Sequence, residues 1–172
     1  MTDLNKWTQK AQEALQKARE TAIRFSHQQL DTEHLLAALL DLPEGLAVSL
    51  LQRLGVALPQ LRARVEEELE RKPRVSGDVE EGKIYVTQAL NELLVKAGDT
   101  ARRLKDEYLS VEHLLLAMTD SGRRAACGRL LAEAGVDTKR LLEALKEVRG
   151  NQRVTTNNPE GQYEALKKYG ND

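Results

Sequence analysis

Apolar residues recur every three or four positions along most of this chain. In the first stretch they are Trp7, Ala11, Ala14, Leu15, Ala18, Ala22 and Phe25. In a second stretch they are Val86, Leu90, Leu93, Leu94, Ala97, Ala101 and Leu104. This spacing places the apolar side chains on one face of a helix, so each stretch predicts a long amphipathic helix.

The two stretches belong to an internal repeat. When residues 7–41 are aligned without a gap on residues 86–120, 16 of 35 positions are identical. After a slip of one residue the match resumes, because Leu50-Leu51 and Gly55-Val56 correspond to Leu130-Leu131 and Gly135-Val136. A unit of this length, repeated once, predicts two similar subdomains packed as a pseudo-dimer. The expected fold is all-α, with eight helices as two pseudo-symmetric four-helix repeats.

The pattern also predicts where the other helices and the boundaries lie. Short apolar helices are expected to begin near Thr32 and near Ser110, and Gly55 and Gly135 are natural helix stops. The remaining helices are expected at 44–54, 58–71, 122–134 and 137–149. We expect one domain over 1–149, made of repeat 1 (about 3–71), a polar loop (72–85) and repeat 2 (about 86–149). Residues 150–172 have the composition of a linker toward a further module, with a short helix at Tyr163–Tyr169.

Composition narrows the classes of function. The chain has 172 residues, of which 41% are hydrophobic and 3% aromatic, so Leu, Ala and Val must build the core. A net charge of −1, from 26 basic and 27 acidic residues, gives no footprint for nucleic acid. No apolar run approaches the roughly 20 residues of a membrane span, and the start of the chain lacks the apolar core of a signal peptide. We therefore expect a cytoplasmic protein without membrane contact, and an inert, packed Cys127.

The starts of the short helices carry the candidate site. Asp31 or Thr32, and Ser110, can cap free backbone N–H groups, and Glu33 and Glu112 follow in the first turn, where the helix dipole favours negative charge. These glutamates either complete the caps or form a duplicated pair of docking points for basic groups at exposed helix starts. Thr8 and Asp106 would join the same face if the long helix packs beside the short one. The seam between the repeats should leave a groove lined by Leu, Ala and Val.

Enzyme and metal interpretations find little support. His34 and His113 each follow a glutamate, but neighbouring residues point about 100° apart on a helix and no further ligands stand at metal spacing, so capping turns explain them better. The run Gly77-x4-Gly82-Lys83 approaches a phosphate-binding loop. Ile84 stands where a Ser or Thr would ligate magnesium, however, and no apolar strand precedes the loop. We expect no catalytic residues, no metal and no cofactor in this chain.

Several motifs together resemble a known family. They are Thr32-Glu33-His34-Leu35-Leu36 with Val111-Glu112-His113-Leu114-Leu115, the opening Trp7-Thr8-x-x-Ala11-x-x-Ala14-Leu15, and the paired Gly-Val turns. They resemble the Clp N-terminal domain that begins the Hsp100/Clp class of AAA+ unfoldases. The tail, with Asn158-Pro159-Glu160 and 163–170, resembles the linker of the ClpB branch.

The resemblance implies a mobile recognition domain on a hexameric disaggregase that cooperates with the DnaK (Hsp70) system. Such domains engage unfolded or aggregated polypeptide and pass it to an ATPase ring, whose ATP and Mg sites lie in other modules. By analogy, Thr8, Asp106 and Glu112 matter for substrate engagement, and the apolar groove holds exposed hydrophobic stretches. This fragment alone would be a monomer.

Two alternatives remain open. In the ClpC branch, glutamates matching Glu33 and Glu112 would bind phosphoarginine or an adaptor protein. In a different class of function, the domain is a structural or regulatory spacer that does not touch substrate.

Overall fold

The computed structural model describes residues 4–42, 45–77, 79, 83–150 and 154–155. Within these residues the chain forms eight α-helices, two short 3-10 helices and two strands of two residues each. In chain order they are η1 (Leu4–Lys6), α1 (Gln9–Arg24), β1 (Gln29–Leu30), α2 (Thr32–Asp41), α3 (Leu46–Arg53), α4 (Leu58–Arg71), β2 (Tyr85–Val86), α5 (Gln88–Arg103), α6 (Val111–Asp120), η3 (Gly122–Arg124), α7 (Ala126–Glu133) and α8 (Thr138–Arg149). The predicted all-α fold with eight helices is confirmed.

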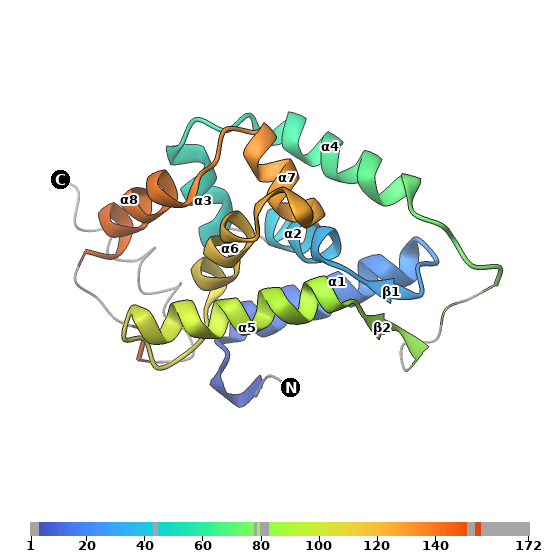
Figure 1. Cartoon of the computed structure of the whole chain (residues 1–172), viewed down its shortest axis with the longest axis horizontal. Helices are drawn as coiled ribbons and strands as arrows, with labels where there is room; N and C mark the ends of the chain where they lie inside the picture. The colour runs from blue at the N-terminus through green and yellow to red at the C-terminus, as the bar shows by residue number, and fades with distance from the viewer. Residues whose placement is uncertain (1–3, 43–44, 78, 80–82, 151–153, 156–172) are drawn as a thin grey trace.

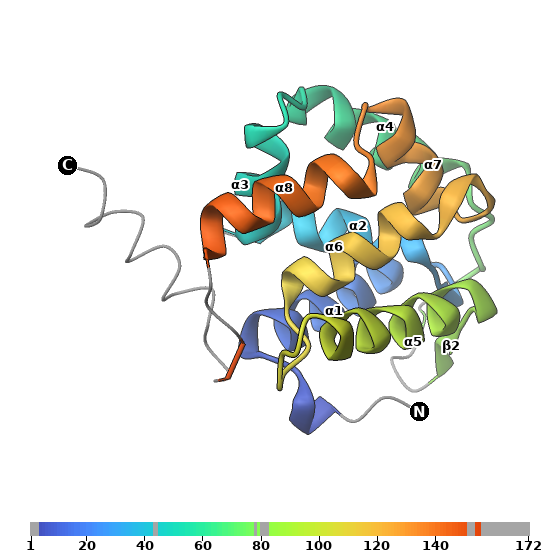
Figure 2. The ribbon, with the colours of Figure 1, turned by 60° about the vertical axis from the view of Figure 1, so that its left-hand side comes forward.

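The helices form three layers. The short helices α2 and α6 lie in the middle, α1 and α5 cover one side, and α3, α4, α7 and α8 cover the other (Figures 1 and 2). The middle helices are buried along nearly their whole length, with Leu35, Leu36, Leu114 and Leu115 fully inaccessible. Each leucine buried in this way stabilises the fold by about 2 kcal/mol, so the apolar runs of the sequence explain why these two helices occupy the centre.

The helix starts follow from local side-chain chemistry. Thr8 and Thr87 cap α1 and α5, and each hydroxyl accepts a hydrogen bond from the backbone N–H three residues later (3.2 and 3.1 Å). Asp31 and Ser110 cap α2 and α6, as predicted. The Gly stops are confirmed as well, because Gly55 and Gly135 follow α3 and α7 with positive φ (+78° and +85°), a conformation that favours glycine.

Two features differ from the sequence prediction. The helix expected at 122–134 is divided, because η3 ends at Arg124 and α7 begins at Ala126. Gly128 allows the two parts to pack closely, because a Cβ there would overlap the carbonyl oxygen of Gly122 in the η3 turn. In addition, the end of the predicted loop contains β2, which pairs in parallel with β1. The predicted helix at Tyr163–Tyr169 and most of the Gly77–Lys83 motif lie outside the described residues.

The two repeats exchange strands. β2 precedes α5 of the second repeat but pairs with β1 of the first, with Leu30 opposite Val86. Reciprocally, Trp7 precedes α1 of the first repeat but bridges to Leu109 of the second. The hydrogen bonds match, since the Thr8 N–H donates to Leu109 O (2.9 Å) and the Thr87 N–H donates to Leu30 O (3.0 Å). The repeats therefore form one interlocked domain.

No single described helix is both long and apolar enough to cross a membrane. The α2–α3 pair, bent by 88°, has the length and composition of a membrane span when its two helices are taken together.

Candidate functional site

The first corner of the molecule is built at the start of α2. The Asp31 N–H donates to His34 Nδ1 (2.9 Å), which closes a capping box in which a histidine takes the place of the usual Glu or Gln. His34 Nε2 lies 2.8 Å from His27 Nδ1. Lys72 reaches in from the end of α4 and donates to Glu33 (3.1 Å) and Asp31 (3.5 Å). We refer to Asp31, Glu33, His34, His27 and Lys72 as the first corner.

Burial dominates the electrostatics of the first corner. Burial raises the pKa of Glu33, with a further contribution from Asp31. Burial also lowers the pKa of His34 to about 4, helped by His27 and Lys72. The pKa of Lys72 is raised, because the carboxylates of Glu33 and Asp31 outweigh the opposing effect of its own burial. Burial, with Lys72 and Arg74, also lowers the pKa of His27, so both histidines are neutral at pH 7, next to the contact between Lys72 and Glu33.

The second corner repeats this frame with different partners. The Ser110 N–H donates to His113 Nδ1 (2.8 Å), so His113 Nε2 carries the proton and donates to Asp106 Oδ2 (2.7 Å). Arg149, the last residue of α8, donates to both carboxylate oxygens of Asp106 (3.0 and 2.6 Å) and lies 3.5 Å from Glu112. The Ser110 hydroxyl donates to Glu112. We refer to Asp106, Ser110, Glu112, His113 and Arg149 as the second corner.

Asp106 is the centre of the second corner. Burial alone would raise its pKa, but hydrogen bonds from His113, Arg149 and the Val154 N–H lower the pKa of this carboxyl well below its usual range. The same carboxylate thus accepts from three separate parts of the chain, in α6, α8 and the segment after α8.

The structure corrects the expected exposure of the candidate residues. Glu33 and Glu112 were expected at exposed helix starts, but their relative exposures are 4% and 0%. Thr8 is fully buried as well, and Asp106 is 8% exposed. Cations from α4 and α8 cover the helix starts, which a local sequence pattern does not reveal. Asp106 and Glu112 belong to the second corner, Thr8 borders it through its N–H bond to Leu109 O (2.9 Å), and Glu33 belongs to the first corner. A substrate-binding role for these four residues stays a prediction.

An open groove borders the second corner. It lies between α5 and the segment around η1, and has a volume of about 780 Å³. Its lining residues are Lys6, Trp7, Asn91, Leu94, Val95, Gly98, Ala101, Arg102, Asp106, Glu107 and Leu109. We call this the α5 groove. Val95 is 61% exposed there, and Gly98 leaves space, since the nearest heavy atom to a Cβ at this position would be Arg102 Nη1 at 3.9 Å.

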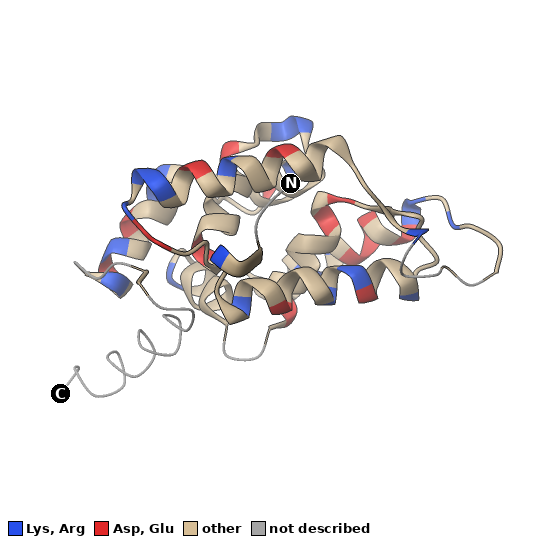
Figure 3. Cartoon of the chain, turned by 90° about the horizontal axis from the view of Figure 1, so that it is seen from below, with Lys and Arg blue, Asp and Glu red and all other residues tan. Residues whose placement is uncertain are grey.

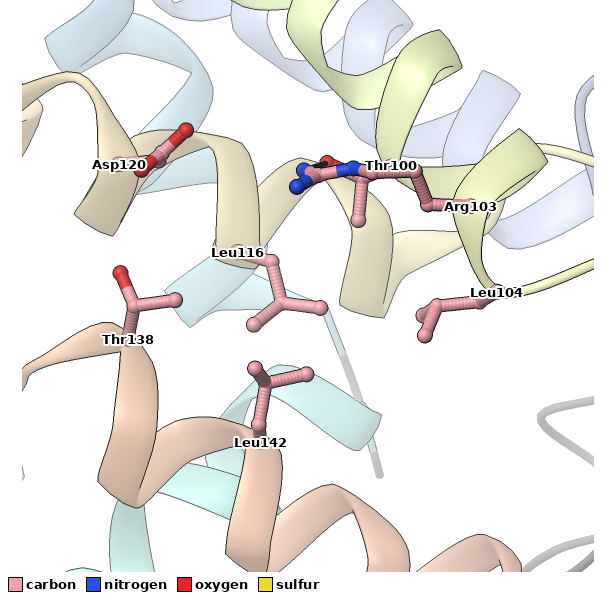
Figure 4. Close-up of a pocket in the computed structure, with 7 residues that line it drawn as sticks. All are labelled: Thr100, Arg103, Leu104, Leu116, Asp120, Thr138 and Leu142. Carbon is pink, nitrogen blue, oxygen red and sulfur yellow. Dashed lines mark hydrogen bonds between the residues drawn. The ribbon is translucent and has the colours of Figure 1, made fainter.

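Smaller pockets occur at matching places in the two repeats. Figure 4 shows the one in the second repeat, about 150 Å³, where Leu116 and Leu142 face each other below Arg103 and Thr100. Its counterpart in the first repeat contains Arg62, whose guanidinium donates to Leu40 O (2.9 Å). The second pocket is therefore more apolar, because Leu142 stands where the first repeat has Arg62.

The structure also tests two further sequence features, Cys127 and the possible metal ligands. Cys127 is fully buried, and burial raises the pKa of its thiol to about 12, which fits the predicted packing role. Among the described residues, no group of three or more His, Cys, Asp or Glu side chains is placed to hold a metal ion.

Sequence reasoning missed four residues of this region. Lys72 and Arg149 are the cations of the two corners, Val154 donates to Asp106, and Gly98 opens the groove. Only Gly98 left a signal, as an isolated glycine inside a helical pattern.

Comparisons with known proteins agree with this architecture. The family model of the Clp repeat (R) N-terminal domain matches residues 6–127. A ClpB chaperone of Bacillus cereus is 46% identical over 171 residues, which cover 99% of this chain and 20% of that relative. A ClpB chaperone of Nitratidesulfovibrio vulgaris is 44% identical over the same length, again with 99% and 20% covered. The chain thus spans about one fifth of the length of these relatives.

Solved structures share the fold. The Hsp104 N-terminal domain from Candida albicans superposes with a TM-score of 0.76 at 24% identity, covering 90% of this chain and 98% of that one. The N-terminal domain of the ClpV1 ATPase from E. coli gives a TM-score of 0.72 at 23% identity, covering 86% and 88%.

Proposed function

Because the chain belongs to the Clp repeat (R) N-terminal domain family, we propose that it is the substrate-recognition domain of an ATP-dependent ClpB-type disaggregase, and that its α5 groove binds apolar segments of unfolded or aggregated polypeptide. The observation that carries this proposal is the groove itself, which combines a largely apolar lining, with the Val95 side chain 61% exposed, and a volume in the range of ligand-binding clefts.

The chemistry of the groove suits an extended apolar peptide. Leu94, Val95 and Ala101 offer apolar contact, and Lys6, Arg102 and Glu107 place charges of both signs around them. Along the ribbon in Figure 3, positions of Lys and Arg are interspersed with positions of Asp and Glu. Such a site favours apolar content over a particular charge, which fits a client class defined by exposed hydrophobic residues.

The remaining elements of the proposal concern the whole protein. We propose that this domain acts in the cytoplasm as part of a homohexamer whose other modules bind ATP and Mg, in cooperation with the DnaK system. Six linked domains would compensate for weak binding in each groove, because tethering raises the effective concentration. Within this scheme, Thr8, Asp106 and Glu112 serve client binding by holding the wall of the groove.

Two observations weigh against phosphoarginine or adaptor docking on the glutamates. A guanidinium ligand needs an open carboxylate, whereas Glu33 already pairs with Lys72 and Glu112 lies beside Arg149. Both glutamates are buried, so an incoming cation would have to displace one that the chain supplies itself, at the cost of leaving a buried charge unpaired.

The test is a titration of the chain with permanently unfolded casein, followed by amide NMR shifts and by the fluorescence of Trp7, the single tryptophan and a groove residue. Gly98→Arg introduces the residue found at the matching position of the first repeat, Arg19. We expect it to lower casein affinity about tenfold or more, which corresponds to about 1.4 kcal/mol, since the arginine side chain fills the open space and places a charge against the apolar lining.

Gln88→Arg is the matched control, because Gln88 is an exposed α5 residue outside the groove. Its affinity should stay within about twofold of the parent chain. Equal casein binding by the parent and by Gly98→Arg would reject the groove. Shifts at Glu33 and Glu112 with free phosphoarginine, without casein binding, would favour the docking alternative. No response to either ligand would favour the structural spacer.

A further inference from the structure

The chain that follows α8 returns to the wall of the α5 groove. Val154 is fully buried, and its N–H donates to Asp106 Oδ1 (2.9 Å). Its carbonyl oxygen accepts from the N–H groups of Glu107 (2.8 Å) and Tyr108 (3.3 Å). Val154, which lies beyond the last helix, thus makes three hydrogen bonds with the loop between α5 and α6.

Arg149 ties the end of α8 to the same carboxylate. Its two hydrogen bonds to Asp106 form the bidentate arrangement that fixes both partners in orientation as well as in distance. Gly150 follows with φ +60°, so the helix ends there and the chain turns. Arg149 and Val154 thus both bind the Asp106 carboxylate. We call Arg149, Val154 and Asp106 the clamp.

The first repeat lacks this clamp. The residue matching Arg149, 80 positions earlier, is Leu69, and the residue matching Asp106 is His27. Helix α4 continues through the position that matches Gly150 and ends at Arg71. In the first repeat the segment after α4 also returns to the loop after α1, where the Val75 N–H donates to Ser26 O (2.9 Å), so only the carboxylate-centred clamp is specific to the second repeat.

The loop held by the clamp is also part of the groove. Asp106, Glu107 and Leu109 line the α5 groove, while Leu109 additionally pairs with Lys6 and Trp7. One side of the loop is thus fixed by the start of the chain and the other by the segment after α8. Releasing Val154 would free the backbone N–H groups of Glu107 and Tyr108, while Asp106 stays bound to His113 and Arg149 and Leu109 stays in place.

We propose that occupation of the α5 groove and the path of the chain after α8 are coupled through Asp106, with Arg149 and Val154 acting as positioning residues for the groove wall. This inference rests on the proposed function. A peptide that contacts the wall binds the clamped state better than the released state, so peptide binding strengthens the clamp. By linkage, releasing the clamp weakens peptide binding by the same factor.

The test uses the full 172-residue chain and two matched variants. Val154→Asp places a second carboxylate against Asp106 and releases the segment, whereas Thr155→Asp adds the same charge at the next, exposed position. We expect Val154→Asp to weaken casein binding about tenfold, within the usual range of coupling between sites, and Thr155→Asp to change it less than about twofold. Amide hydrogen exchange at Glu107 and Tyr108 gives the reciprocal measurement, because casein should slow it in the parent chain and not in Val154→Asp.

The outcomes separate the two proposals. If the parent chain does not bind casein, the proposed function fails. If the parent binds casein and Val154→Asp binds equally well while its Glu107 amide exchanges fast, the coupling alone is overturned. Arg149→Lys is a milder variant that keeps the charge but loses the bidentate fork. It should lie between the parent and Val154→Asp in both affinity and exchange, and parent-like values in both would also overturn the coupling.

Discussion

The two corners show how one duplicated frame acquires two different roles. Both keep the Glu-His pair and the histidine-closed capping box. In the first corner the histidine meets His27 and the glutamate meets Lys72. In the second the histidine meets Asp106, which is tied to the end of α8. The shared residues preserve the helix starts, whereas the differing partners decide what each corner connects to.

The long helices differ in the same manner. Val95 and Gly98 of α5 correspond to Gln16 and Arg19 of α1. The second repeat thus places an apolar side chain and an open position where the first has two polar side chains. Pseudo-symmetry duplicates the scaffold, and these two differences make this part of α5 more apolar than the matching part of α1.

The largest effect should come from removing the cation of the second corner. Arg149→Leu installs the residue of the matching position and leaves Asp106 and Glu112 buried without their cation. Removing one partner of a buried ion pair costs about 3–5 kcal/mol, so the free energy of unfolding, measured by urea denaturation, should fall by that amount. Lys146→Leu, on an exposed position of α8, should change it by less than about 0.5 kcal/mol. Similar effects of the two variants would contradict the assignment of Arg149.

The next largest effect should be the loss of stability in acid that comes from His34 of the first corner. The pKa of His34 is about 4 in the folded chain and near 6.5 when unfolded, so the unfolded state binds more protons between these values. Stability conferred by neutral His34 is therefore present above pH 6.5 and lost as the pH falls toward 4, by about 3 kcal/mol. Urea denaturation at pH 7, 6, 5 and 4 measures the loss. His34→Gln retains an acceptor for the capping box but does not titrate, so its profile should be flatter. An identical profile would show that His34 is not the source.

The break before α7 gives a third contrast. Gly128 matches Val48 of the first repeat, but its Cβ would meet the Gly122 carbonyl, a backbone atom. Gly128→Ala should therefore destabilise the chain by about 1–3 kcal/mol, the usual range for overpacking, as measured by thermal unfolding. A stabilised variant would mean that η3 moves away without cost.

Gly98→Ala should have the smallest effect and the opposite sign. No heavy atom lies closer than 3.9 Å to a Cβ at this position, and alanine in a helix interior is favoured over glycine by about 0.5–1 kcal/mol. We expect a higher thermal midpoint, with casein binding slightly reduced because the groove narrows. A lower midpoint would indicate that the backbone near Gly98 requires glycine for another reason.

The sequence allowed the local features to be predicted and left the long-range ones unspecified. The bounds of α4, the caps Asp31 and Ser110, and the stop at Gly55 follow from residues within one helical turn. The two-residue strands are too short for an alternating pattern to reveal them.

The site was harder to predict because its contacts join distant segments. Lys72 is 39 residues from Glu33, and Arg149 is 43 residues from Asp106. The expectation that Glu33 and Glu112 stand exposed was wrong, since no local pattern indicates which cation will cover a helix start.

The exchanged strands constrain the order in which this chain can fold during synthesis. β1 can pair with β2 only after residue 86 has left the ribosome, and Trp7 can pair with Leu109 only after residue 109 has done so. Such contacts between distant residues close large loops and form late. The nascent first repeat must therefore pass through a stage in which its start and β1 are both unpaired, and its sheet edges become protected only when the second copy arrives.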